Sequence, residues 1–230
     1  LKSCPENPPG AKEIFNFNLP LSVGGYFLSA SAIILASFIA RAPDPDRILP
    51  VYYLALGLAN PVAFAATRLQ TIVLAFPPQS GKDSRTFRFC LTAGIVLGIL
   101  PLIFVLPGFA EFYFIRLQKL NAQDLLLVRV TVMALVFFPF SVAMRAQSEG
   151  LAAWLKKPIT VLTGHAMFMG TILATGFALL YFGTPGQFIG PLGLTLGSLA
   201  SSATMRYMLD RGKESTLPVG QTTTSVGQIR

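Results

Sequence analysis

Six long apolar runs, separated by short polar or basic segments, constrain what this chain can fold into. They cover residues 15–40, 48–76, 89–106, 125–144, 159–182 and 189–208. A helix needs about 20 apolar residues to cross a bilayer, and these runs approach or exceed that length. Inside lipid, a helix satisfies all its backbone polar groups within its own segment. The sequence therefore predicts an all-α integral membrane protein whose six transmembrane helices form one bundle.

The low content of charged residues supports this class. Only 12% of the 230 residues are charged and 53% are hydrophobic, and the mean hydropathy is +0.60, whereas about a quarter of the residues in a soluble domain are charged. The net charge of +8 would suggest nucleic acid as the partner of a soluble protein. Here the basic residues lie between the apolar runs and at the ends of the chain, so we expect membrane lipids and no nucleic acid as their partners.

Lys and Arg are divided unequally between the two faces that six spans would create. Twelve of the eighteen fall on the side of the termini, five fall on the opposite side, and Arg68 lies inside a span. Cytoplasmic loops carry the excess of positive charge, so both termini are predicted to be cytoplasmic, with the bundle in the cytoplasmic membrane. Residues 1–14 form a polar N-terminal segment, residues 15–208 the bundle, and the Thr/Ser/Gly-rich residues 209–230 a disordered tail.

The connection between the fourth and fifth runs, within residues 137–158, is the most distinctive segment. Arg145, Lys156 and Lys157 bracket a polar stretch, residues 147–150, that ends in Gly150. Basic residues just outside two apolar runs are typical of a cytoplasmic loop. We therefore expect a basic loop here, anchored to anionic lipid headgroups.

Residues 107–123 are not apolar enough to span. Tyr113, Leu117 and Leu120 nevertheless recur at helical spacing, with Arg116 and Lys119 to one side. This pattern predicts either an interfacial amphipathic helix or a loop on the lipid surface.

Polar residues within the runs are candidates for a substrate path. Arg68 keeps its charge in a membrane and either attracts an anion into a cavity or snorkels to the surface. Thr67 and Gln70 extend the polar patch around it. His165, inside the fifth run, is suited to proton coupling or to a structural hydrogen bond, and Asn60 either lines a cavity or bonds a neighbouring helix.

Four prolines lie within or near spans, and we expect helix kinks at them: Pro20, Pro61, Pro101 and Pro139. Kinked or broken helices recur where transporters line a cavity, although prolines are in any case commoner in membrane helices than in soluble ones. The spacings Gly94-x-x-x-Gly98 and Gly193-x-x-x-Gly197 allow helices to pack closely.

No pattern of catalytic residues is present. The chain has one histidine, no Cys/His cluster, no Ser/His/Asp arrangement and no Walker-type phosphate loop. Cys4 and Cys90 are far apart and indicate neither a disulfide framework nor a metal site. An enzyme acting on lipids would need acid, base or metal groups at one depth, and none converge. We therefore expect no enzyme, no cofactor and no bound metal.

A family resemblance rests on the same connector. Arg145-Ala146-x-x-x-Gly150 followed by Leu155-Lys156-Lys157 resembles the loop between the tenth and eleventh spans of the progressive ankylosis proteins, which belong to the multidrug-and-toxin-extrusion (MATE) and polysaccharide-flippase superfamily. Three further segments support the resemblance: Leu19-Pro20-Leu21, Pro61-Val62 and Gly190-x-x-Gly193-x-x-x-Gly197.

The resemblance implies a fold of two six-helix bundles related by a pseudo-twofold axis along the membrane normal, of which this chain would be the second. Family members move small molecules by alternating access driven by Na⁺ or H⁺, and the ankylosis branch is associated with the export of organic or phosphorylated anions. This chain departs from the pattern in having one bundle, so either a second copy or a separate subunit supplies the other wall, or the first half is missing here. It also departs in lacking the intramembrane carboxylates that are typical of the ion-coupled relatives, because we expect all its acidic residues in loops, tails or span ends.

Two functions from different classes follow. The first is a half-size secondary transporter that moves an organic solute, an anion if Arg68 attracts it, with Asn60 and His165 along the path. The second is a non-transporting accessory or scaffold subunit of a larger membrane complex, which the half length and the lack of intramembrane carboxylates favour.

Overall fold

The computed structural model describes residues 10–77 and 85–214. Within these ranges every regular element is a helix and no strand occurs. Five helical segments are long and apolar enough to cross a membrane: Ile14–Ile39, Pro45–Ala75, Arg85–Val105, Ala122–Trp154 and Pro158–Tyr181. The prediction of an all-helical membrane protein with several spans is confirmed.

Eight α-helices are joined by shorter helical pieces. The α-helices are α1 (Ala11–Ile39), α2 (Pro45–Thr67), α3 (Leu69–Ala75), α4 (Arg85–Ile99), α5 (Leu125–Ala134), α6 (Phe137–Trp154), α7 (Pro158–Tyr181) and α8 (Gly186–Glu214). Between α4 and α5 lie the 3₁₀ turn η1 (Leu100–Val105), the π-helical turn η2 (Glu111–Leu117) and the 3₁₀ turn η3 (Ala122–Asp124). Several spans are thus built from more than one helix.

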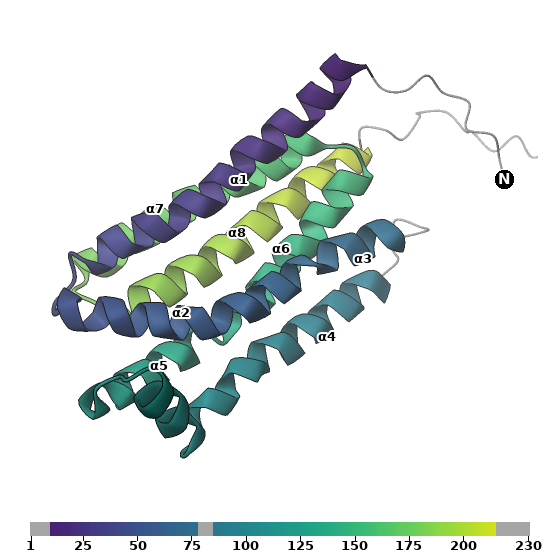
Figure 1. Cartoon of the computed structure of the whole chain (residues 1–230). Helices are drawn as coiled ribbons and strands as arrows, with labels where there is room; N and C mark the ends of the chain where they lie inside the picture. The colour runs from purple at the N-terminus through teal and green to yellow at the C-terminus, as the bar shows by residue number, and fades with distance from the viewer. Residues whose placement is uncertain (1–9, 78–84, 215–230) are drawn as a thin grey trace, which may run out of the picture.

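Helix α8 contains the sixth predicted span, residues 189–208, but is not among the five apolar segments. Its buried side carries small residues such as Gly193, Gly197, Ser198 and Ser201. Helix α8 packs on α7, α6 and α1, and it lies in the middle of the bundle in Figure 1. A helix surrounded by other helices needs less apolar surface than one that faces lipid. Figure 1 also shows the start of α1 and the end of α8 at the same end of the bundle.

Close helix contacts depend on glycines. A Cβ added at Gly94 would lie 2.8 Å from Cβ of Ala143, and one at Gly98 would lie 2.8 Å from the carbonyl oxygen of Val136. The close packing expected from Gly94-x-x-x-Gly98 therefore occurs between α4 and α6. At Gly190, an added Cβ would overlap the buried ring of Tyr52, so α8 approaches α2 as closely as a glycine allows.

The four intramembrane prolines differ in their effect on the helices. At Pro139 the missing N–H leaves the carbonyl of Leu135 without its usual partner, and that oxygen instead accepts the N–H of Phe138 at 3.0 Å where α5 gives way to α6. Pro101 lies in η1, immediately after α4 ends. Helices α1 and α2 continue through Pro20 and Pro61. Helix boundaries therefore lie at or next to Pro101 and Pro139, whereas Pro20 and Pro61 lie inside continuous helices.

The basic loop predicted around Arg145 is not a loop. Helix α6 continues to Trp154, and both Arg145 and Gly150 are buried within it. A Cβ at Gly150 would lie 2.8 Å from Cβ of Val73, so α3 covers this part of α6. The true connection is Leu155–Lys157, in which Lys156 is exposed and has a positive φ of 53°. Polar residues inside α6 were interpreted as a turn because they are uncommon in a membrane helix, whereas here they face other helices.

Two other segments add detail to the expectations. Residues 107–123, expected as an interfacial amphipathic helix or a loop on the lipid surface, contain no regular α-helix. They form η2 and η3, which bury Phe114 and leave Leu117 61% exposed. Helix α8 extends to Glu214, so residues 209–214 are helical rather than part of a disordered tail. The rest of the predicted tail, and residues 1–9 of the predicted N-terminal segment, lie outside the described residues.

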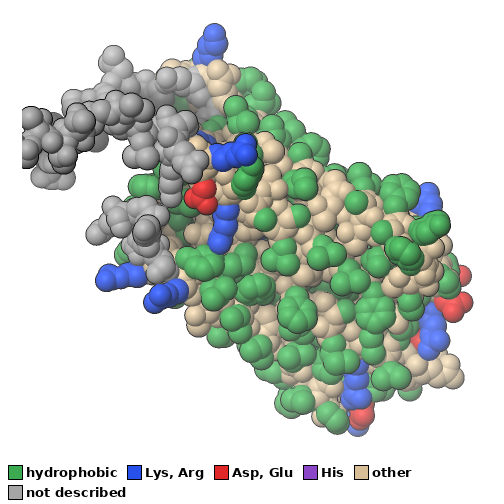
Figure 2. Space-filling model, turned by 180° about the vertical axis from the view of Figure 1, so that it is seen from behind, with side chains coloured by type: hydrophobic (Ala, Val, Ile, Leu, Met, Phe, Trp, Pro, Cys, Tyr) green, Lys and Arg blue, Asp and Glu red, His purple; other side chains and the backbone are tan. Residues whose placement is uncertain are grey.

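The surface matches a membrane environment. Many large apolar side chains are exposed along the helices, including Tyr26, Ile33, Phe64 and Phe177, each more than 65% exposed. Soluble monomers rarely expose so much contiguous apolar surface. Figure 2 shows one such face, where Lys, Arg, Asp and Glu gather toward the two ends and hydrophobic side chains cover the middle.

Candidate functional site

Helices α6 and α7 bring together three ionisable side chains in the interior of the bundle. Arg145 and Glu149 are four residues apart on α6 and so lie on one face of that helix. Nε of Arg145 is 3.3 Å from Oε1 of Glu149. The same Oε1 atom is 2.8 Å from Nε2 of His165 on α7. One carboxylate oxygen therefore serves both an arginine and a histidine.

All three side chains are largely removed from solvent. Arg145 is 7% exposed, His165 is 5% exposed, and the side chain of Glu149 is 13% exposed. Charges are taken out of water at a cost of several kcal/mol each unless they are paired. The guanidinium of Arg145 also lies over the ring of Phe168, with Cζ 5.1 Å from the ring centroid. Arg145 and Glu149 thus form a largely buried ion pair, and His165 contacts its carboxylate.

Glu149 corrects the expectation that no carboxylate lies inside the bundle. It belongs to the apolar segment Ala122–Trp154 and is enclosed by α6 and α7. The i, i+4 spacing of Arg145 and Glu149 indicates that this segment is helical, because such a pair stabilises a helix. Because the surrounding polar residues are interpreted as a turn in the sequence, the helical pairing of Arg145 with Glu149 is not recognised there.

Arg145 also lines a pocket of about 300 Å³ that is partly open to the surface. Two sides come from α1, through Ser29 and Ser31, and from α2, through Tyr52 and Asn60. Helices α6, α7 and α8 provide the floor, which includes Phe168. A smaller pocket of about 130 Å³ adjoins it, is also lined by Arg145 and Asn60, and extends along α2 to Thr67.

Several polar groups at this pocket have no hydrogen-bond partner within the described part of the chain. The buried Nε of Arg145 has no hydrogen-bond partner there, although it lies 3.3 Å from Oε1 of Glu149. The hydroxyl of Tyr52 is buried and has no partner. Buried polar groups are normally paired, so unpaired groups around a cavity indicate a place for a ligand.

The structure brings together some of the residues expected on a substrate path and separates others. Asn60 and Thr67 line the pockets with Arg145. His165 lies behind them and reaches the pocket only through Glu149. Arg68 is exposed at the break between α2 and α3, and Gln70 contacts Gly150 instead. Neither of these two lines the pocket. Arg145, expected in a loop, is the arginine that does.

A second polar cluster joins α6 to α8. Arg206 donates from Nη2 to Oε1 of Gln147 at 2.7 Å and from Nε to Oγ of Ser148 at 3.2 Å. Oγ of Ser202 lies 2.9 Å from Oγ of Ser148 and donates to the carbonyl of Met144 at 3.0 Å. These bonds satisfy most of the group's polar atoms, so this cluster acts as a structural connection between helices.

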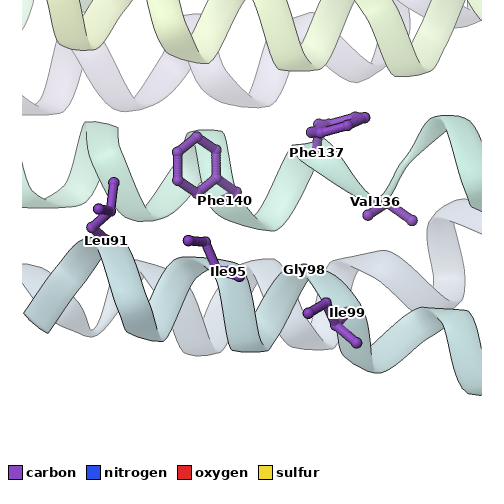
Figure 3. Close-up of a pocket in the computed structure, with 7 residues that line it drawn as sticks. All are labelled: Leu91, Ile95, Gly98, Ile99, Val136, Phe137 and Phe140. Atoms are coloured by element: carbon purple, nitrogen blue, oxygen red, sulfur yellow. The ribbon is translucent and has the colours of Figure 1, made fainter.

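Another pocket, of about 280 Å³, lies between α4 and α6 and is apolar. Leu91, Ile95 and Ile99 line it from α4 and Phe137 and Phe140 from α6, with Gly98 between the two helices (Figure 3). It offers no polar side chain to orient a solute. Across residues 10–77 and 85–214, no group of three or more His, Cys, Asp or Glu side chains is placed to hold a metal ion.

No family model, no curated protein and no solved structure matches this chain.

Proposed function

We propose that this chain is one helical bundle of a secondary transporter that moves an organic anion across the cytoplasmic membrane by alternating access. The observation that supports it most strongly is the guanidinium of Arg145, which lines a pocket and belongs to a helical segment apolar and long enough to span a membrane. Its buried Nε has no hydrogen-bond partner among the described residues. A charged residue within a span is costly and marks a functional site.

The chemistry of the pocket favours an anion with an apolar body. Arg145 supplies a fixed positive charge and a planar set of donors suited to a carboxylate, sulfonate or phosphate. Asn60 adds an amide beside it, and Phe64, Phe138 and Phe168 provide apolar surface. The substrate class is therefore an organic anion rather than an inorganic ion.

The open side of the pocket is the place for a second bundle. Helices α1 and α2 form its two sides and make few contacts with each other beyond their connection. Phe64, at the edge, is 69% exposed. In this proposal another copy of the chain or a separate six-helix subunit covers this side, as the resemblance to the MATE superfamily implies, and movement of the two bundles exposes the pocket to each face of the membrane in turn.

Uptake of radiolabelled benzenesulfonate into proteoliposomes tests the function, after extraction in mild detergent to establish the mass and composition of the particle. We expect two bundles per particle, saturable uptake, and a fall of at least about tenfold in Arg145→Gln. The matched control Arg88→Gln removes the same charge from the exposed surface of α4 and should keep the wild-type rate.

Three results would contradict the proposal. A single copy bound at the edge of a large assembly, without uptake, would establish the accessory-subunit alternative. Equal rates of benzenesulfonate uptake in Arg145→Gln and Arg88→Gln would show that the substrate does not pass through the pocket. Loss of uptake in Arg68→Gln but not in Arg145→Gln would show that the substrate path runs along the break between α2 and α3.

A further inference from the structure

The ion cluster behind the pocket has a charge balance that an incoming anion would disturb. With a neutral imidazole, the positive Arg145 and the negative Glu149 cancel, and His165 contributes a hydrogen bond to the shared Oε1 atom. An anion that binds the terminal nitrogens of Arg145 brings a second negative charge next to Glu149. The proposed function places such an anion there, and the inference below rests on it.

The surroundings provide little to offset this charge. Helix α1 presents Gly24 to Nδ1 of His165, and that nitrogen is buried without a hydrogen-bond partner. Helix α3 presents Gln70 and Val73 to the neighbouring Gly150. These contacts carry no charge, so the excess negative charge stays uncompensated on these two sides.

The remaining neighbours are α2, α4 and α8. Helix α4 meets α6 through Gly94 and Gly98, and its buried thiol, Cys90, is uncharged. Helix α2 contributes the neutral Tyr52 and Asn60 to the pocket. Helix α8 contributes Arg206, whose guanidinium is bound to Gln147 and Ser148 and lies within electrostatic reach of Asp210 on the same helix. An uncompensated charge in a medium of low dielectric constant costs several kcal/mol, and titratable groups there change protonation state instead.

We propose that the Glu149–His165 pair takes up one proton from solution when an anion binds at Arg145, so that the proton and the anion move together. The 2.8 Å contact between Nε2 and Oε1 lets the two side chains share the proton, which belongs to the pair rather than to either residue. The occupied cluster then carries Arg145, the ligand and the protonated pair with no net charge. Release of the anion returns the negative charge to Glu149 and releases the proton.

Proton uptake on binding is measured with a pH-indicator dye in weakly buffered detergent solution, using the whole protein and benzenesulfonate as the probe. A sulfonate stays ionised throughout the pH range used, so the dye reports only protons that the protein binds. We expect close to one proton per bound anion at pH values where the free pair is unprotonated. In the same range, linkage predicts that affinity falls about tenfold for each unit of increasing pH.

Glu149→Gln is the decisive variant, because it removes the negative charge and keeps the size of the side chain. The cluster then starts with a net positive charge, so benzenesulfonate should bind without proton uptake and with an affinity independent of pH. Arg145→Gln should show neither binding nor proton uptake, whereas Arg88→Gln should behave as the wild type. In proteoliposomes, an inwardly directed proton gradient should accelerate wild-type uptake but leave the rate in Glu149→Gln unchanged.

The outcomes separate this inference from the proposed function. Binding to the wild type without proton uptake and with pH-independent affinity would overturn proton coupling and leave the anion site intact. Proton uptake that persists in Glu149→Gln would show that another group binds the proton and would contradict its assignment to the Glu149–His165 pair. Absence of benzenesulfonate binding to the wild type at any pH would overturn both proposals.

Discussion

Glu149 and His165 lie sixteen residues apart in the chain and meet across the interface of α6 and α7, with Oε1 of the carboxylate 2.8 Å from Nε2 of the imidazole. Arg145 approaches the same oxygen from the preceding turn of α6. The three side chains form one electrostatic unit, so the effect of changing any one of them depends on the other two.

Removal of Arg145 alone should destabilise the fold, because it leaves Glu149 buried without its positive partner. The expected loss in Arg145→Gln is about 3–5 kcal/mol in the free energy of unfolding. The double variant Arg145→Gln/Glu149→Gln should recover most of this loss, since no unpaired charge remains. Thermal unfolding in detergent, followed by intrinsic fluorescence, measures both. Equal destabilisation in the single and double variants would show that the two charges do not interact.

The contact between Gly190 and Tyr52 should not tolerate a methyl group. In Gly190→Ala the added Cβ would overlap the buried ring of Tyr52, which must shift to make room, so we expect a destabilisation of about 1–3 kcal/mol. Gly170→Ala on α7 is the matched control, since nothing lies within 4 Å of its Cβ. That change should be neutral or stabilising by up to about 1 kcal/mol, as alanine favours helix. If Gly190→Ala and Gly170→Ala unfolded at the same temperature, the close approach of α8 to α2 would be contradicted.

The polar connection between α6 and α8 should contribute to stability but not to substrate binding. Arg206→Gln removes two charge-assisted hydrogen bonds and the contact of the guanidinium with the ring of Phe87, 4.4 Å from the centroid. We expect a loss of about 1.5–3 kcal/mol in unfolding free energy. Arg211→Gln, in which only an exposed stacking contact on Tyr207 is lost, serves as the control. A lower affinity for benzenesulfonate in Arg206→Gln at unchanged stability would place this cluster on the substrate path.

The topology can be tested with single cysteines in a background of Cys4→Ser and Cys90→Ser. Lys157→Cys and Arg211→Cys should be labelled by a membrane-impermeant maleimide only from the cytoplasmic side, and Thr184→Cys, in the turn between α7 and α8, only from the opposite side. This pattern is expected if α8 crosses the membrane and the termini are cytoplasmic. Labelling of positions 184 and 211 from the same side would mean that α8 does not span.

The helical membrane class follows from the sequence because it depends on local properties. A run of apolar residues must satisfy its backbone hydrogen bonds internally and turn its side chains to lipid, whatever its neighbours are. The predicted span 159–182 accordingly corresponds to α7, and 48–76 corresponds to α2 with α3. At Pro139, where the sequence predicts a kink, α5 gives way to α6, since proline lacks the N–H that a continuing helix requires.

The ion cluster and the pocket were decided by tertiary structure. Gln147, Ser148 and Glu149 have the composition of a loop, and sequence alone does not show that α3, α7 and α8 surround them. Arg68 was favoured over Arg145 because it lies well within an apolar run, yet it is exposed while Arg145 is buried. The sequence by itself determined which segments are membrane helices. Only the packing of those helices determined which polar side chains face each other, because that depends on helix rotation and on contacts between residues far apart in the chain.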